Sequence, residues 1–181
     1  MTITETELKG LLLLEPKVFE DQRGYFFESF NQQNFSKKGL DLNFVQDNQS
    51  KSQKNVLRGL HFQKPPFAQG KLIHVIKGAV LDIAVDIRNL SPSYGKHVSI
   101  ELNEANKLML YIPPGFAHGF LTLEDETIFT YKCTEFYNPD AESAIYWNDK
   151  TLNIDWGLDD PVLSEKDQNA IAFSQFSSPF Q

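Results

Sequence analysis

Two of the four histidines, His61 and His118, stand in sequence settings that suit proton transfer. His61 lies in an extended run, and His118 follows a Pro/Gly corner that ends one strand and directs the next side chains inward. An imidazole titrates near neutral pH and can serve as a general base or a general acid. A histidine taken alone is more often structural than catalytic, and we expect His74 and His97 to be structural.

The backbone around His61 decides whether its ring can share a cavity with Arg58. In residues 56–63, strict strand alternation places Arg58 and His61 on opposite sides. A bulge at Gly59 would re-aim the chain and let both side chains face one cavity.

Short strands separated by Gly, Pro and Asn turns make up most of the chain and must position these side chains. Strand-like runs are expected at 25–30, 55–63, 71–76, 79–87, 96–102, 107–112, 119–123, 127–137 and 144–147. Residues 71–87 give the clearest hairpin signal, with a two-residue turn at Lys77 and Gly78. The strands lack intervening helical periodicity, which predicts an antiparallel sandwich or barrel.

Two short helices are expected outside these strands. Asn31 can cap a helix that runs through Phe35 and stops at Gly39. Near the other end, Ser164 begins a capping box in which Asp167 is the third residue after the cap.

The length of 181 residues fits one globular domain with its own core. We therefore expect a single domain over residues 1–181. Within it, residues 1–50 form N-terminal strands and a short helix, and residues 160–181 form a helical or extended C-terminal tail.

The charge balance excludes some classes of partner. Lys and Arg total 17 against 24 Asp and Glu, a net charge of −7, which removes the positive field that binding to nucleic acid or anionic membranes needs. The only cysteine, Cys133, cannot form an intramolecular disulfide, and no run approaches about 18 apolar residues. The start of the chain lacks a basic region before its short apolar run at 11–14. We expect a cytoplasmic protein that binds neither nucleic acid nor membrane.

The segment Pro113-x-Gly115-x-x-His118 resembles the second motif of the cupin superfamily, whose domain is a small double-stranded β-helix with an open mouth. Metal-binding cupins also need a His-x-His motif followed by Glu, so that imidazoles and a carboxylate converge on one ion. Here that segment reads His61-Phe62-Gln63, with no Glu after it. We therefore expect no metal ion, because the ligands are too few for a first-row metal. A cavity that keeps one histidine without its co-ligands suits proton transfer better.

Five longer segments carry a more specific resemblance, which extends from about residue 14 to about residue 167. They are VFEDQRGYFFESF at 18–30, FVQDNQSKS at 44–52, VLRGLH at 56–61, SPSYGK at 91–96 and GFAHGF at 115–120. Together they closely resemble the dTDP-4-dehydrorhamnose 3,5-epimerases of dTDP-L-rhamnose biosynthesis. This resemblance implies a mostly β, cupin-type antiparallel double-stranded β-helix of the jelly-roll kind with a few short helices.

The resemblance also implies a reaction: dTDP-4-dehydro-6-deoxy-D-glucose is inverted at C3 and C5 to dTDP-4-dehydro-L-rhamnose, without a cofactor. Each inversion needs a base on one face of the sugar, a group that stabilises the enolate oxygen, and an acid on the other face. By resemblance, His61 is the base and Asp167 the carboxylate that orients it. Lys71 is the cation near the keto oxygen, and Tyr131 is the acid.

Further residues are implied to hold the substrate. Those matched to the nucleotide are Phe19, Arg23, Glu28, Gln46, Asp47, Asn48, Arg58 and Lys166, and those matched to the sugar are His118 and Glu142. The resemblance also implies a homodimer whose N-terminal strands cross to the neighbouring subunit, so that Arg23 and Glu28 would serve the partner's site. The matched cations predict a positive cavity inside a protein of negative net charge.

Alternatives remain at the level of the sequence. Asp167 could be only a capping residue, Tyr131 strand filler, and Lys71 and Arg58 solvated cations. A mono-functional 5- or 3-epimerase of a dTDP-4-keto-6-deoxy sugar, or a keto-isomerase on the same substrate class, would share the fold and differ around the acid and the base. A non-catalytic sugar-nucleotide-binding cupin is a further alternative. The full set of four matched residues favours double epimerisation.

Overall fold

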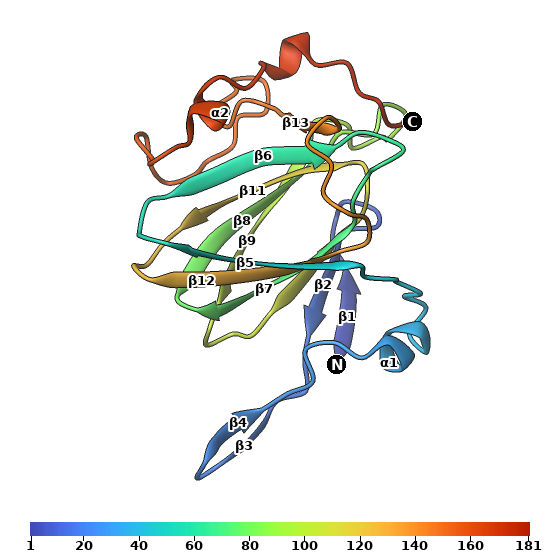
Figure 1. The fold of residues 1–181 in the computed structure, drawn as a ribbon, viewed down its shortest axis with the longest axis vertical. Coiled ribbons are helices and arrows are strands. Elements are labelled where there is room, and N and C mark those ends of the chain that lie inside the picture. The colour runs from blue at the N-terminus through green and yellow to red at the C-terminus, as the bar shows by residue number, and fades with distance from the viewer.

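The computed structural model describes residues 1–181 and consists mainly of two antiparallel sheets packed face to face (Figure 1). The six-stranded sheet contains, in spatial order, β1 (Thr2–Glu5), β2 (Leu12–Glu15), β10 (Met109–Ile112), β7 (Lys71–Lys77), β12 (Thr127–Cys133) and β5 (Gln46–Ser52). The five-stranded sheet contains β13 (Glu142–Ala144), β6 (Leu57–Gln63), β11 (Phe116–Thr122), β8 (Ala79–Asp86) and β9 (His97–Asn103). The predicted antiparallel, mostly β architecture is therefore confirmed.

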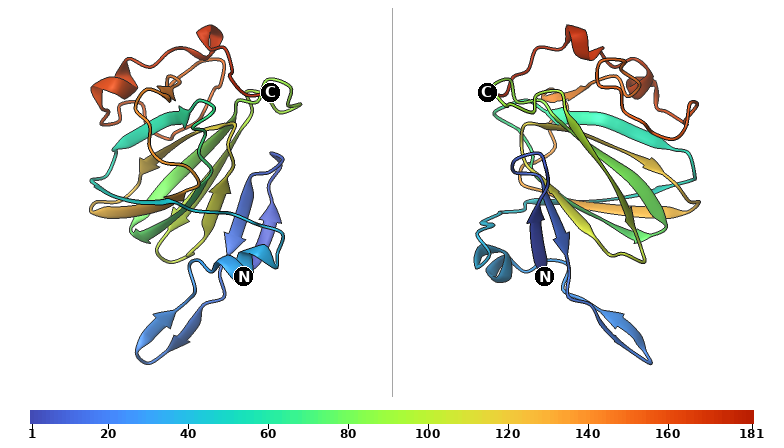
Figure 2. Two further views of the ribbon diagram at one scale, coloured as in Figure 1. Left: turned by 45° about the vertical axis from the view of Figure 1, so that its right-hand side comes forward. Right: turned by 180° about the vertical axis from the view of Figure 1, so that it is seen from behind.

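The remaining elements are short. A two-stranded hairpin of β3 (Phe19–Asp21) and β4 (Gly24–Phe26) projects from the body as an arm, which Figure 2 shows clearly from both sides. The helices are α1 (Gln32–Ser36), α2 (Glu165–Gln168) and the single-turn 3-10 helix η1 (Phe173–Gln175). Asn31 caps α1 by accepting a hydrogen bond from the backbone N–H of Asn34 at 3.1 Å, as the sequence predicts.

The predicted hairpin over residues 71–87 is wrong. β7 and β8 lie in different sheets, β7 between β10 and β12 and β8 between β11 and β9. Gly78, with φ of +81°, carries the chain from one sheet to the other. Both are interior strands of their sheets with a neighbour along each edge, and three of the four neighbours, β10, β11 and β12, come from distant parts of the chain. A two-residue turn therefore serves here as a corner between sheets.

Three apolar clusters hold the fold together. The one between the two sheets includes Ile73 and Val75 of β7 and Val80 and Ala84 of β8. A second cluster covers the outer face of the five-stranded sheet, and a third lies between the six-stranded sheet and α1. The space between the sheets is thus filled with apolar side chains over part of its length, and its remaining part holds polar ones.

The C-terminal segment packs on the outer face of the five-stranded sheet. The ring of Phe62 lies 5.4 Å from that of Phe176 and 6.1 Å from that of Phe180, measured between centroids. The buried Asp149 carboxylate accepts a hydrogen bond from the backbone N–H of Phe173 at 2.8 Å. These contacts fix the segment that carries α2 beside β6.

Candidate active site

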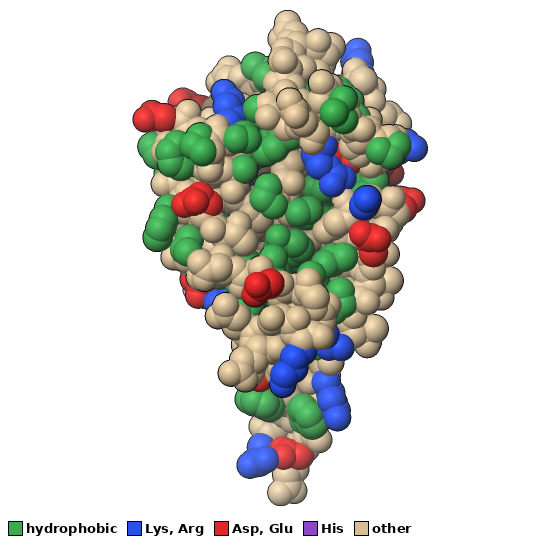
Figure 3. Space-filling view, turned by 90° about the vertical axis from the view of Figure 1, so that its right-hand side faces the viewer, with side chains coloured by type: hydrophobic (Ala, Val, Ile, Leu, Met, Phe, Trp, Pro, Cys, Tyr) green, Lys and Arg blue, Asp and Glu red, His purple; other side chains and the backbone are tan.

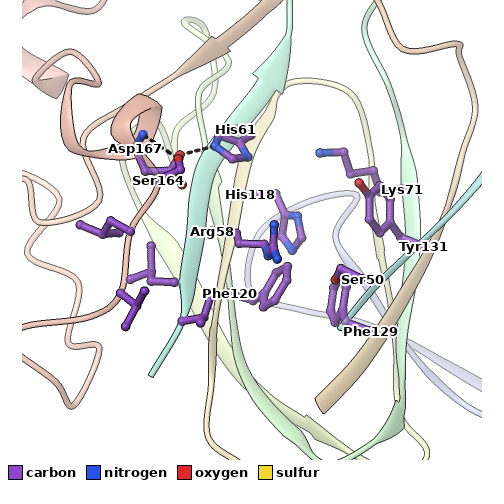
Figure 4. A pocket seen from close by; sticks show the side chains of 14 residues that line it. Ser50, Arg58, His61, Lys71, His118, Phe120, Phe129, Tyr131, Ser164 and Asp167 are labelled. Atoms are coloured by element: carbon purple, nitrogen blue, oxygen red, sulfur yellow. Dashed lines mark hydrogen bonds and ion pairs between the residues drawn. The ribbon is translucent and has the colours of Figure 1, made fainter. Parts of the chain in front are cut away.

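A cavity of about 450 Å³ lies between the two sheets, where the apolar core gives way to polar side chains (Figure 4). Its lining is Ser50, Val56, Leu57, Arg58, His61, Lys71, His118, Phe120, Phe129, Tyr131, Val162, Leu163, Ser164 and Asp167. A second lobe of about 270 Å³ shares His61, Lys71 and Tyr131 with it and adds Gln46, Asn48, Phe62, Gln63, Gln69, Tyr137 and Glu142. All four residues matched to catalytic roles therefore line one site.

His61 is held by a buried carboxylate. Its Nε2 lies 2.5 Å from Oδ1 of Asp167, which is only 2% exposed. Oδ2 of Asp167 accepts a hydrogen bond from the Ser164 hydroxyl at 2.9 Å, and the same hydroxyl caps α2 by accepting from the Asp167 N–H. Burial raises the pKa of Asp167, but the hydrogen bonds from His61 and Ser164 outweigh it and lower that pKa below its ordinary value. Asp167 is thus both a capping-box residue and the partner of His61.

β6 contains the bulge at Gly59 that the sequence leaves open. His118 pairs with His61 and Phe120 pairs with Arg58, so Gly59 and Leu60 together oppose the single residue Gly119. The extra residue shifts the alternation, and Arg58 and His61 both line the cavity as a result.

Gly59 is the position at which this arrangement is most easily broken. Its φ is +143°, and a Cβ there would lie 2.4 Å from the Cα of Gly119. We predict that Gly59→Ala lowers the free energy of unfolding by about 3 kcal/mol and removes activity, since strained backbone and overpacking add. Gly157→Ala is the control, because Gly157 has φ of +69° in open space and should cost about 1 kcal/mol. Thermal unfolding of both variants measures the difference; equal losses would contradict the role given to Gly59.

Lys71 and Tyr131 face His61 from the opposite sheet (Figure 4). Lys71 begins β7 and Tyr131 lies on β12, with the Lys71 ammonium 5.9 Å from the centre of the Tyr131 ring. Burial lowers the pKa of Lys71, which brings its ammonium closer to releasing a proton. Burial also raises the pKa of Tyr131, so its phenol stays protonated at neutral pH and can donate a proton.

His118 projects into the cavity from β11, beside β6. It is buried, and its Nε2 lies 2.8 Å from Oδ2 of Asp82 on β8. Burial raises the pKa of Asp82, although the nearby His118 and Lys71 pull it in the other direction. His118 is therefore a fixed polar group in the wall of the site.

Strand alternation divides the three consecutive residues matched to the nucleotide. Gln46 and Asn48 face the second lobe. Ser50, the next residue of β5 on the same side, lines the main cavity. Asp47 points to the outer face of the sheet, where it pairs with the Lys132 ammonium at 2.9 Å. The structure therefore does not bring Asp47 to the cavity of its own chain, because neighbouring residues of a strand face opposite sides.

Glu142 and Lys166 meet at the rim of the second lobe. Lys166, from α2, forms an ion pair with Glu142 of β13. The hydroxyl of Tyr137 donates a hydrogen bond to the same carboxylate at 2.7 Å. Burial raises the pKa of Glu142, but these two partners outweigh it and leave the pKa lowered. Of the other matched cations, Arg58 lies at the mouth with its guanidinium 3.2 Å from the Ser52 hydroxyl.

Three matched residues lie away from this cavity, on or beside the arm. The Arg23 side chain is 85% exposed and pairs with Asp21, and Phe19 lies on the same hairpin. Glu28 follows the arm and accepts hydrogen bonds from the side-chain amides of Asn31 and Asn34. Figure 3 shows the arm as a narrow end of the molecule that carries hydrophobic, basic and acidic side chains.

Sequence reasoning missed several residues of the site. Ser50 and Tyr137 line it, and so does Gln63, which stands where the metal motif would have its second histidine. Alternation from Gln46 and Asn48 points to Ser50, whereas Tyr137 lies in a loop that no periodicity describes. No group of three or more His, Cys, Asp or Glu side chains is arranged to hold a metal ion. No helix combines the length and the apolar character needed to cross a membrane.

Comparisons with known proteins identify the family of the chain. The family model for dTDP-4-dehydrorhamnose 3,5-epimerase matches residues 5–175. A dTDP-4-dehydrorhamnose 3,5-epimerase of Shigella flexneri is 52% identical over 174 residues, which is 96% of each chain.

Two solved structures are also similar. An epimerase of Legionella pneumophila in complex with dTDP-4-keto-L-rhamnose has a TM-score of 0.94 and 44% identity, covering 99% of this chain and 98% of that one. A 3'-monoepimerase of Streptomyces bikiniensis in complex with dTDP-quinovose has a TM-score of 0.89 and 31% identity, covering 93% and 86%. The predicted cupin-type fold is thereby confirmed. The chain belongs to the dTDP-4-dehydrorhamnose 3,5-epimerase family and is an isomerase of the epimerase type.

Proposed function

We propose that this protein epimerises dTDP-4-dehydro-6-deoxy-D-glucose at C3 and C5 to give dTDP-4-dehydro-L-rhamnose. One observation carries the proposal. On one sheet lies a histidine whose ring is held by the carboxylate of Asp167, and it faces a lysine and a tyrosine of the other sheet across a single cavity. Inversion at a carbon requires a base and an acid on opposite faces of the sugar, and two facing sheets supply opposite faces.

In the proposed mechanism His61 is the base. Its Nε2 is bound to Asp167, so Nδ1 is the nitrogen free to take the proton from C3 or C5. The electron pair of the broken C–H bond moves toward C4, and the keto oxygen becomes an enolate oxygen that the Lys71 ammonium stabilises. Tyr131 then gives its phenolic proton to the same carbon from the other side. Exchange with solvent restores His61 and Tyr131, and no redox cofactor or metal takes part.

Substrate binding is proposed along the length of the cavity. Arg58 and Lys166 would pair with the diphosphate, to which a guanidinium fork can donate two hydrogen bonds. Gln46 and Asn48 would contact the nucleoside, and His118 and Glu142 the sugar. All 181 residues are proposed to act as one cytoplasmic domain.

We also propose a homodimer in which the arm completes the neighbouring site. A two-stranded hairpin is marginal by itself, and this one exposes 54% of Phe19 and 67% of Phe26 to solvent. Docked on a second copy, the arm would bring the partner subunit's Arg23 to the diphosphate, with the partner subunit's Phe19 stacked on the thymine and the partner subunit's Glu28 near it. Asp47, on the outer face of its own sheet, would then lie toward the neighbouring subunit.

A mono-functional epimerase is the second candidate, and the similarity to the 3'-monoepimerase of Streptomyces bikiniensis favours keeping it. The product distinguishes the two functions. Incubation of the purified protein with dTDP-4-dehydro-6-deoxy-D-glucose, reduction of the keto group with borohydride and NMR of the released sugar report the configuration at each carbon. The proposal expects L-rhamno products with both centres inverted; inversion at one centre would establish the mono-epimerase, and unchanged substrate would exclude both.

A further inference from the structure

Gln63 is a buried amide directly beside the catalytic candidates. It ends β6, two residues after His61, and is only 5% exposed. Its Cα pairs with that of Glu142 on β13, and its side chain contributes to the second lobe of the cavity. The epimerisation chemistry gives it no proton to move, so its place there calls for another explanation.

The amide group of Gln63 makes three hydrogen bonds, and each of them is to the backbone of a loop. Nε2 donates to the carbonyl of Phe67 at 2.7 Å and to the carbonyl of Phe136 at 3.1 Å. Oε1 accepts from the backbone N–H of Asn138 at 2.8 Å. One side chain therefore ties together the loop that follows β6 and the loop that follows β12.

These two loops form the wall of the second lobe. The first carries Gln69 and the second carries Tyr137, and both side chains line the lobe with His61 and Lys71. Tyr137 lies between the two residues of its loop that Gln63 holds, and its hydroxyl donates to Glu142.

That contact continues toward the base. Glu142 pairs with Lys166, and Lys166 precedes Asp167, the carboxylate that holds His61. The position of Tyr137 is thus connected through neighbouring contacts to the orientation of the imidazole.

We propose that Gln63 is a positioning residue, which fixes the two rim loops so that the lobe is preformed around the substrate. This inference rests on the proposed function for the identity of that substrate. Buried backbone groups that lose their partners are costly, so removal of the amide should let the loops move apart. A small displacement of the sugar relative to His61 and Tyr131 then slows the chemical step.

Gln63→Met tests this role, because methionine keeps the length and bulk of the side chain and removes all three hydrogen bonds. We expect kcat to fall on the order of 10- to 100-fold while KM stays within about threefold. The affinity for dTDP alone should fall by no more than about threefold, since Arg58, which is proposed to hold the diphosphate, is untouched, and Gln46 touches the loosened loop through one hydrogen bond from the Tyr137 N–H. Amide hydrogen exchange at Asn138 should become faster.

Asn106→Ala is the matched control. The Asn106 amide also makes three hydrogen bonds to backbone, with Glu101, Asn103 and Leu108, but it lies in the loop between β9 and β10 outside the cavity. Its kcat should equal that of the wild type. The proposal is overturned if Gln63→Met keeps the wild-type kcat, if it loses dTDP binding as well, or if Asn106→Ala loses kcat equally. Failure of the wild type to turn over the substrate would count against the proposed function alone, because dTDP binding and amide exchange still report on Gln63.

Discussion

Replacing His61 with asparagine should reduce turnover of dTDP-4-dehydro-6-deoxy-D-glucose by about 10³-fold, within the range that a positioned general base contributes. Asparagine places its amide nitrogen near the position of Nδ1, so it keeps part of the packing of the ring but loses the contact that Nε2 makes with Asp167. Its amide also cannot take a proton from carbon. The loss should fall on kcat. Initial rates of product formation, followed by NMR, measure it.

His74→Asn is the control for this substitution. His74 lies on the outer face of β7 and contacts the Thr130 hydroxyl at 3.1 Å, away from the cavity. Its rate should remain within about twofold of the wild type, because it takes no part in the proton transfer. A rate for His61→Asn above about one tenth of the wild type would remove His61 from the role of base.

Replacing Lys71 with methionine should reduce kcat by about 100-fold, which corresponds to about 3 kcal/mol of barrier. The ammonium acts on charge that develops only in the enolate, so its loss slows the reaction more than it weakens substrate binding. Steady-state kinetics of the variant separate the two effects.

Lys77→Met changes the same residue type at the exposed end of the same strand and should leave kcat unchanged. If Lys71→Met raised KM and kept the wild-type kcat, Lys71 would bind the substrate equally in the ground state and the transition state. That result would require another group to stabilise the enolate.

The sequence predicts the elements better than it predicts their partners. Helix caps at Asn31 and Ser164 are local, and both are present because the side chain and the N–H it accepts from lie within three residues. The turn at Gly78 is local as well, yet the partners of β7 and β8 depend on how strands from the whole chain pack their apolar faces together. A correct turn signal therefore led to a wrong hairpin.

The site shows the same division. Alternation and the bulge at Gly59 explain why Arg58 and His61 share the cavity, and alternation also places Asp47 on the outer face. The contact between His61 and Asp167 spans more than a hundred residues, so resemblance alone could place it. Tyr137 and the hydrogen bonds of Gln63 depend on two loops without periodic pattern, and only the structure reveals them.

Solvent exchange at the two carbons tests the central claim most directly, since that claim assigns both inversions to one site. The wild-type protein is incubated with dTDP-4-dehydro-6-deoxy-D-glucose in deuterated water, and deuterium at C3 and at C5 of the sugar is measured by NMR. The proposed mechanism predicts deuterium at both carbons, and its absence from both with His61→Asn over the same time. Deuterium at a single carbon, or exchange at both carbons that persists at the wild-type rate without His61, would contradict it.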